Sequence, residues 1–191
     1  MRTFVALNFS AETRVAMHSA TAPLRERWAR GVSWLPESAL HVTLAFLGER
    51  ESSFVDMLTD RLRAGTRSLA APELHVHVVG SFPSLARPRV LWLGVDLNPE
   101  VARLYQSVAS TCDALGVARE TRPFHPHVTF GRVRVGTQID AKALVHEAVA
   151  VTYEARERAP SVDVMESVLG GGGARYRVAA SIPLNTMQGN D

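Results

Sequence analysis

His41-Val42-Thr43-Leu44 is the stretch that decides the fold, because it recurs 86 residues later as His127-Val128-Thr129-Phe130. Each tetrapeptide lies in an apolar run of the kind that forms β-strands. Residues two apart along a strand point to the same face, so each His projects together with its Thr. The apolar residues of the motif then face the core. The repeat therefore predicts two strands that each present a His–Thr pair.

The spacing of 86 residues extends beyond the motif. It carries the apolar run at 3–9 into the strand expected over 89–97, and a helix expected over about 11–29 onto about 97–115. Asn98 and Pro99 mark the start of this second helix, as an N-cap residue followed by Pro at the first helical position. We therefore predict one domain, residues 1–191, made of two halves of about 1–86 and 87–191 with a pseudo-twofold relationship.

The other elements follow from the apolar pattern and the breakers of the chain. Pro23 is expected to interrupt the first helix and Pro83 to end a strand. Gly170–Gly173 are expected to form a flexible turn between the last two strands. The remaining elements are strands over 40–47, 73–82, 127–135, 161–170 and 175–184, and helices over 52–69 and 138–150.

The composition is that of an ordinary globular protein, with 46% hydrophobic and 21% charged residues. The net charge of +2 does not indicate non-specific DNA coating, although 20 of the 21 basic residues are Arg, which suits phosphate recognition. No apolar run approaches the ~20 residues of a membrane span, and the first residues do not form a secretory signal. We therefore expect a cytoplasmic protein. The single Cys112 excludes an internal disulfide and is expected in the core.

Two facing His–Thr pairs carry the chemistry of in-line displacement at a phosphodiester. One imidazole can activate the nucleophile while the other protonates the leaving oxygen near neutral pH. The hydroxyls of Thr43 and Thr129 can donate hydrogen bonds to the non-bridging oxygens of a phosphate that lies between the two pairs. This mechanism requires no metal and no cofactor. The symmetry of the two motifs leaves open which His is the acid.

These motifs resemble the two-histidine (2H) phosphoesterase superfamily, whose signature is two His-x-Thr-x tetrapeptides. The greatest similarity is to the bacterial and archaeal RNA 2′,3′-cyclic phosphodiesterases, often called 2′-5′ RNA ligases. The resemblance spans nearly the whole chain and rests on Phe4–Phe9, Trp34, Leu40–Gly48, Gly80–Pro83, Pro88–Trp92, Phe124–Arg132, Ser167, Leu169, Gly173 and Tyr176. One departure is Gly131, where a larger apolar residue or Ala is usual.

The resemblance implies an α+β, bilobal, duplicated fold, with antiparallel sheets lining a central groove and helices on the outer faces. It implies hydrolysis of an RNA-terminal 2′,3′-cyclic phosphate to a 2′-phosphate, with ligation as the reverse reaction. In the family, the first-motif His donates a proton to the departing 3′ oxygen and the second-motif His activates water. Carried over, His41 is the proton donor and His127 the proton acceptor.

Six further residues are candidate substrate-binding groups: Arg132, Phe9, Phe46, Trp34, Tyr176 and His125. The resemblance assigns the Arg to the substrate phosphate, and the position equivalent to it in the first half is Phe46. The aromatic side chains can stack on a terminal base or line the groove. Each of these residues also has a structural alternative. The aromatic side chains could pack in the core. Arg132 could form a surface or interlobe ion pair, and His125 could serve only in a loop.

His75 and His77 also share one strand face. Two histidines at this spacing can bind zinc, but a third ligand is not evident nearby in the sequence. We therefore expect surface or groove-edge residues and no metal.

The main functional hypothesis is thus a monomeric enzyme that acts on RNA ending in a 2′,3′-cyclic phosphate. Within the superfamily, relatives act on 2′-5′ oligonucleotides or on cyclic phosphates derived from nucleotides, and the shared motifs do not separate these substrates. A non-catalytic RNA-binding module is a different class of alternative, but it would not need two titrating groups. A metal-dependent hydrolase is disfavoured because neither motif has clustered Asp and Glu residues near it.

Overall fold

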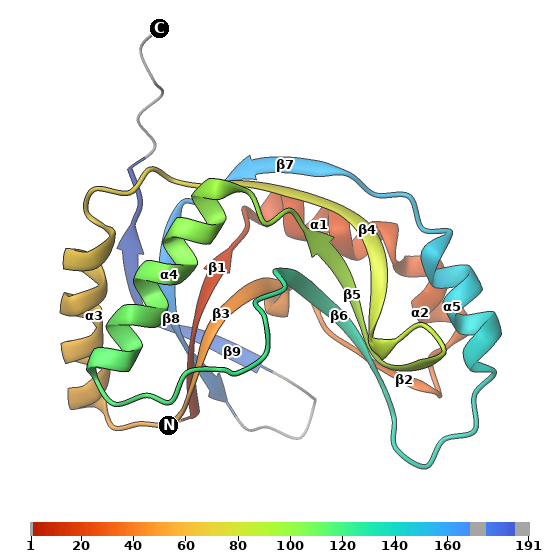
Figure 1. Cartoon of the computed structure of the whole chain (residues 1–191). Helices are drawn as coiled ribbons and strands as arrows, with labels where there is room; N and C mark the ends of the chain where they lie inside the picture. The colour runs from red at the N-terminus through yellow and green to blue at the C-terminus, as the bar shows by residue number, and fades with distance from the viewer. Residues whose placement is uncertain (1, 169–174, 186–191) are drawn as a thin grey trace, which may run out of the picture.

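One antiparallel sheet runs through the computed structural model, which describes residues 2–168 and 175–185 (Figure 1). Eight of its nine strands follow the order β7-β4-β5-β6-β3-β1-β8-β9, and the ninth, β2, pairs with β6 off this path. The strands are β1 (Arg2–Asn8), β2 (Val32–Trp34), β3 (His41–Glu49), β4 (Glu73–Ser84), β5 (Arg87–Val95), β6 (His127–Val133), β7 (Ala155–Arg158), β8 (Ser161–Val168) and β9 (Arg175–Pro183).

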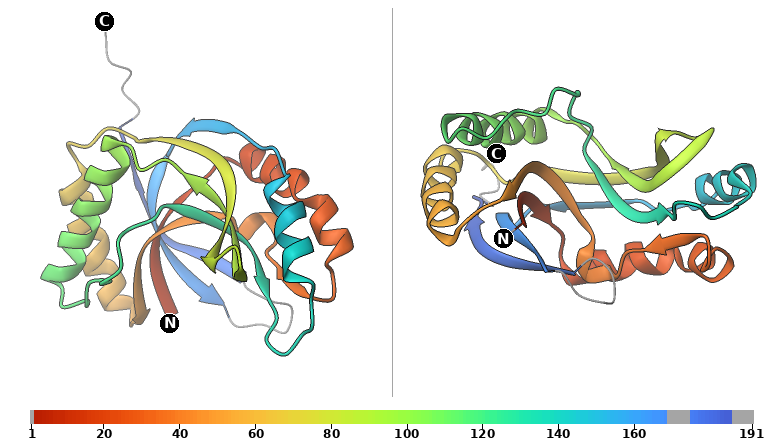
Figure 2. Two further views of the ribbon diagram at one scale, coloured as in Figure 1. Left: turned by 45° about the vertical axis from the view of Figure 1, so that its right-hand side comes forward. Right: turned by 90° about the horizontal axis from the view of Figure 1, so that it is seen from below.

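The helices gather in two groups at opposite ends of this sheet (Figures 1 and 2). In one group α3 packs on α4, and these helices contact β9 and β3. In the other, α5 contacts α2 and the strands β4 and β5. The expected α+β class is confirmed. The helices are α1 (Ala11–Ala20), α2 (Ala22–Arg27), α3 (Ser52–Thr66), α4 (Pro99–Ala114), α5 (Ala141–Val149) and the short 3-10 helix η1 (Glu37–Ala39).

Local sequence signals explain most element boundaries. The side chain of Ser10 caps α1 and that of Asn98 caps α4, each accepting a hydrogen bond from a backbone N–H three residues on. The expected interruption near Pro23 is present, because α1 ends at Ala20 and α2 begins at Ala22. The sequence predicts that the strand β4 ends at Pro83, but it continues to Ser84. Pro83 lies next to the hairpin turn, so its missing N–H removes little of the hydrogen bonding between the strands.

Three short elements are not predicted from the sequence. The strands β2 and β7 and the helix η1 are only three or four residues long, which is too short for a periodic pattern of apolar residues to be recognised. The Gly170–Gly173 turn lies outside the described residues.

The order of elements repeats along the chain. A shift of 86 residues carries β1 onto β5, α1 onto α4, β3 onto β6, α3 onto α5 and β4 onto β8. The sheet reads β4-β5-β6 on one side and β8-β1-β3 on the other, meeting where Val42 pairs with Val128. The sequence predicts separate sheets, but this pair joins them into one continuous sheet. The division of the chain near residue 86 stays a prediction.

The core lies on one face of the motif strands. Val42, Leu44, Val128 and Phe130, the apolar members of the two motifs, are all buried. Cys112 is buried and unpaired, as predicted. None of the helices described is long and apolar enough to cross a membrane.

Candidate active site

The two motifs meet through the pairing of β3 with β6. Val42 lies directly opposite Val128 in this antiparallel pair. Antiparallel register then sets His41 beside Thr129 and Thr43 beside His127. Because both valines are fully buried, the four polar side chains occupy the other face, where they are half-buried. One face of the sheet thus carries both His–Thr pairs.

Backbone carbonyl groups orient both imidazoles in the same way. Nδ1–H of His41 donates to the carbonyl of Ala39 (2.8 Å), and Nδ1–H of His127 donates to the carbonyl of His125 (2.6 Å). A carbonyl oxygen only accepts, so the proton of each neutral ring lies on Nδ1 and Nε2 is left with its lone pair. Nε2 of His41 lies 3.1 Å from Oγ1 of Thr43, whose hydroxyl can donate to it.

Burial and neighbouring positive charge keep both imidazoles neutral in the free protein. The pKa of His41 is lowered to about 4, mainly by burial; the Ala39 hydrogen bond opposes this lowering, and the charges of His127 and Arg132 contribute to it. Burial also lowers the pKa of His127; the hydrogen bond to the His125 carbonyl opposes this lowering, and the charges of His125 and Arg132 add smaller contributions to it. An anionic substrate between the two rings would raise both values, because it stabilises the charged form.

Aromatic side chains contact the imidazole rings of both histidines. Phe4 stacks on His41 at 4.9 Å between ring centroids, and Tyr176 meets the same ring edge-on at 5.1 Å. Around His127, Phe82 lies edge-on at 4.9 Å and Trp92 at 6.1 Å. The sequence predicts only Tyr176 among these four. Phe4, Phe82 and Trp92 come from the strands β1, β4 and β5, so only the sheet register identifies them as site residues.

A glycine makes room for Trp92. A Cβ atom built at Gly80 would lie 2.1 Å from the Trp92 ring, far inside van der Waals contact. Gly80 and Trp92 are cross-strand partners on β4 and β5. The absence of a side chain at residue 80 therefore lets Trp92 lie against His125 and His127.

Four of the six candidate substrate-binding residues lie near the histidines. Arg132 is exposed on β6, and its charge lowers the pKa of both His41 and His127. His125 is exposed, and Tyr176 contacts His41. Phe46 is 72% exposed and lies 6.4 Å from Phe4, so its ring is free to stack on a ligand.

Of the other two candidates, the structure contradicts Phe9, whereas Trp34 is half-buried and its role in substrate binding stays a prediction. Phe9 is 2% exposed and packs in the main core, because it follows Val5 and Leu7 in the alternation that faces the core. Its ring is not available to a base. Trp34 stacks on the buried Phe130 at 6.1 Å and packs against the same core.

Trp34 also explains the unusual glycine of the second motif. A Cβ atom at Gly131 would lie 2.9 Å from the Trp34 ring. A larger residue at position 131 would displace this ring, so Gly131 and Trp34 form a complementary pair.

A repeated antiparallel sheet that presents a His–Thr pair from each copy on one face defines a phosphoesterase of the two-histidine class. Residues 16–168 match the family model described as the 2′-5′ RNA ligase superfamily. The chain belongs to this superfamily, which confirms the resemblance and the expectation of an enzyme.

Individual relatives agree with this membership. The chain is 31% identical over 134 residues to the RNA 2′,3′-cyclic phosphodiesterase of Thermotoga maritima, covering 70% of this chain and 71% of the relative. It is 33% identical over 134 residues to the protein of the same name from Archaeoglobus fulgidus, covering 70% and 73%.

Solved structures share the fold over nearly the full length. TT0787 of Thermus thermophilus superimposes with a TM-score of 0.80 at 24% identity, covering 98% of this chain and 100% of that one. E. coli LigT complexed with 3′-AMP gives a TM-score of 0.69 at 25% identity, covering 96% and 97%.

Proposed function

We propose that this protein hydrolyses the 2′,3′-cyclic phosphate at the end of an RNA chain to a 2′-phosphomonoester. The observation that carries the proposal is the pair of histidines on one face of the β3–β6 ribbon. Each has Nδ1 held by a backbone carbonyl and Nε2 left for chemistry. The names of the relatives from Thermotoga maritima and Archaeoglobus fulgidus support the choice of substrate.

In the proposed reaction, Nε2 of His127 takes a proton from water as the water oxygen attacks phosphorus. The bond between phosphorus and the 3′ oxygen breaks, and His41 gives a proton to that oxygen. The products are a 2′-phosphate and a 3′-hydroxyl group. Because His41 is neutral in the free protein, it must gain its proton as the anionic phosphate binds.

The neighbouring side chains would hold the substrate. Thr43 and Thr129 would donate to the non-bridging phosphate oxygens, where negative charge develops. Arg132 would bind phosphate oxygens, since guanidinium groups suit them geometrically. Phe46 and Tyr176 would contact the terminal base or ribose on the His41 side, and His125 the RNA on the His127 side.

The proposal includes no metal and no cofactor in the chemical step. It also takes the protein to be a monomer that meets RNA ends in the cytoplasm, with 2′-5′ ligation as the reverse reaction.

The proposal is tested with an oligoribonucleotide that ends in a 2′,3′-cyclic phosphate. We expect turnover to a 2′-phosphate, identified by phosphorus NMR and by comparison with authentic 2′- and 3′-phosphorylated standards. Turnover restricted to 2′,3′-cyclic mononucleotides or to 2′-5′ linkages would assign another substrate of the same superfamily. Tight RNA binding without turnover would mean a non-catalytic RNA-binding module.

A further inference from the structure

A second cluster of histidines lies away from the paired motifs. His75 and His77 on β4 stack on one another, with ring centroids 4.4 Å apart and planes 20° from parallel. Asp96, which follows directly after β5, lies beside them because the backbone N–H of Asp96 donates to the carbonyl of His75. The sheet register thus supplies the third ligand that the sequence does not place next to the two histidines.

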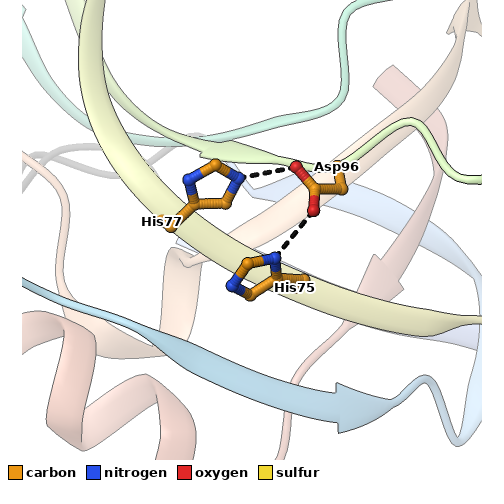
Figure 3. A group of neighbouring side chains, drawn as sticks. All are labelled: His75, His77 and Asp96. Atoms are coloured by element: carbon orange, nitrogen blue, oxygen red, sulfur yellow. Dashed lines mark hydrogen bonds and ion pairs between the residues drawn. The ribbon is translucent and has the colours of Figure 1, made fainter.

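Both imidazoles converge on the one carboxylate, as Figure 3 shows. Nδ1 of His75 lies 2.7 Å from Oδ2 of Asp96, and Nε2 of His77 lies 2.6 Å from Oδ1. These donor atoms all lie within 4.8 Å of one another. Around a tetrahedral zinc ion with bonds of about 2.0–2.2 Å, ligand atoms are about 3.4 Å apart, so each of the two His–Asp distances would lengthen by less than about 1 Å to admit the ion.

We propose that His75, His77 and Asp96 bind a divalent transition-metal ion of the zinc class, with Glu154 orienting His75. Two imidazole nitrogens and a carboxylate oxygen form a donor set that suits zinc, and water would complete the coordination. Oε1 of Glu154 accepts from Nε2 of His75 at 2.9 Å, on the side of the ring away from Asp96. A carboxylate on the second nitrogen of a ligating histidine fixes the ring orientation and strengthens the ligand.

The backbone of β4 is shaped at this cluster. Val78 has a φ of 61°, in the left-handed region that a β-branched residue rarely adopts, and the strand register shifts between His77 and Val79. The resulting bulge returns Val79 to the core, while His75 and His77 stay on the other face. Such local strain persists where the surrounding structure fixes it, and it concentrates at functional sites.

The proposed metal site is separate from the catalytic pair. His77 pairs with Gly94, which pairs in turn with His127, so the two histidines share a face of the sheet. They are two strands apart, about 10 Å at the usual strand spacing. A metal ion at His75 and His77 is therefore compatible with a chemical step that uses His41 and His127 alone.

The test is calorimetric titration of the chelator-treated full chain with Zn²⁺ in a non-coordinating buffer. We expect one saturable site, lost in His77→Gln and Asp96→Asn. Glu154→Gln should weaken it by about 10–100-fold, as is typical for losing an outer-shell partner. His146→Gln, on α5, is the matched control and should bind as the unsubstituted protein does. Circular dichroism without metal should be unchanged in every variant.

Two measurements separate this site from adventitious binding to other histidines. A His41→Ala/His127→Ala double variant should keep the zinc site, and Co²⁺ should give the visible absorption of a four- or five-coordinate ion that His77→Gln abolishes. The absence of saturable binding would overturn the proposal. So would binding that survives His77→Gln and Asp96→Asn, or that disappears when His41 and His127 are replaced.

Discussion

Val42 of β3 and Val128 of β6 are cross-strand partners, and they are 86 residues apart, the spacing that also separates the two His-x-Thr motifs. The centre of the repeat therefore lies at this pair. One register fixes the positions of both histidines and both threonines. A slip of one residue would turn every side chain of one motif to the opposite face. The site thus depends on two buried apolar residues that touch no substrate.

The first prediction concerns the four polar residues that this pair aligns. We expect His41→Ala and His127→Ala each to lower kcat on an RNA cyclic phosphate by at least about 100-fold, since each removes a general acid or base. Thr43→Ala and Thr129→Ala should lower it less, because each removes one neutral hydrogen bond. The control is His146→Ala, a histidine on α5. Circular dichroism should show that all variants fold, and full activity in either active-site His variant would exclude the paired mechanism.

The second prediction is the pH dependence of kcat/KM, which reports the free enzyme. The base must be neutral, so activity falls as pH drops below its pKa. The acid must be protonated, so activity falls as pH rises above its pKa. Burial lowers the pKa of His41 to about 4 and that of His127 below its usual 6.5. We therefore expect kcat/KM to decline as pH rises above 6.5, with a slope that approaches about tenfold per pH unit.

The same reasoning separates kcat from kcat/KM. A bound phosphate raises the pKa of both histidines, so the alkaline decline of kcat should begin at higher pH than that of kcat/KM. Titration of the His41 ring by NMR should give a low pKa in the free protein and a higher one with inorganic phosphate. A kcat/KM that is constant or rises between pH 6.5 and 8.5 would contradict these protonation states.

Much of this site could be predicted from the sequence, and the remainder depends on sheet register. The alternation of side chains along a strand places each His with its Thr without any structure. The same alternation places Phe9 in the core and away from the face that carries His41, because Phe9 continues the buried series of Val5 and Leu7. Cross-strand neighbours are different, because nothing in the local pattern of β5 indicates that Trp92 contacts His127.

The fold shows the same division. Long elements with clear periods, such as α3 and α4, could be predicted to within a few residues. The strand β7 could not, because Ala155–Arg158 is polar and forms only through pairing with β4 at the edge of the sheet. Trp34 lies on the three-residue β2, too short to show which face its ring would take.

The third prediction compares two glycines that each make room for a tryptophan. Gly80→Ala should displace Trp92, and Gly131→Ala should displace Trp34. Each variant should lose about 1–3 kcal/mol of unfolding free energy in urea, as overpacked sites do. Only Gly80→Ala should also lower kcat, because Trp92 contacts His127 while Trp34 packs on the core. Equal loss of kcat in both variants would mean that Trp92 has no special role in positioning His127.

The fourth prediction is that the chemical step is independent of metal. Exhaustive EDTA treatment should leave hydrolysis of the RNA cyclic phosphate intact, because proton transfer by two histidines needs no Lewis acid. Adding Zn²⁺, Mn²⁺ or Mg²⁺ back should not increase the rate. Activity that disappears with EDTA and returns with one of these ions would favour a metal-dependent hydrolase instead.

The last prediction assigns the two histidines to their roles through the leaving group. A ribose 3′ oxygen is a poor leaving group and needs a proton, whereas a nitrophenolate departs unprotonated. If His41 is the acid, His41→Ala should lose much of its activity on RNA and little on a nitrophenyl phosphodiester. His127→Ala should lose activity on both substrates, because water must still be deprotonated. The opposite pattern would mean that the substrate binds in reverse about the Val42–Val128 pair, with a 3′-phosphate as the product. The symmetric backbone contacts of the two rings make this a necessary test, since Nδ1 of each is held in the same way.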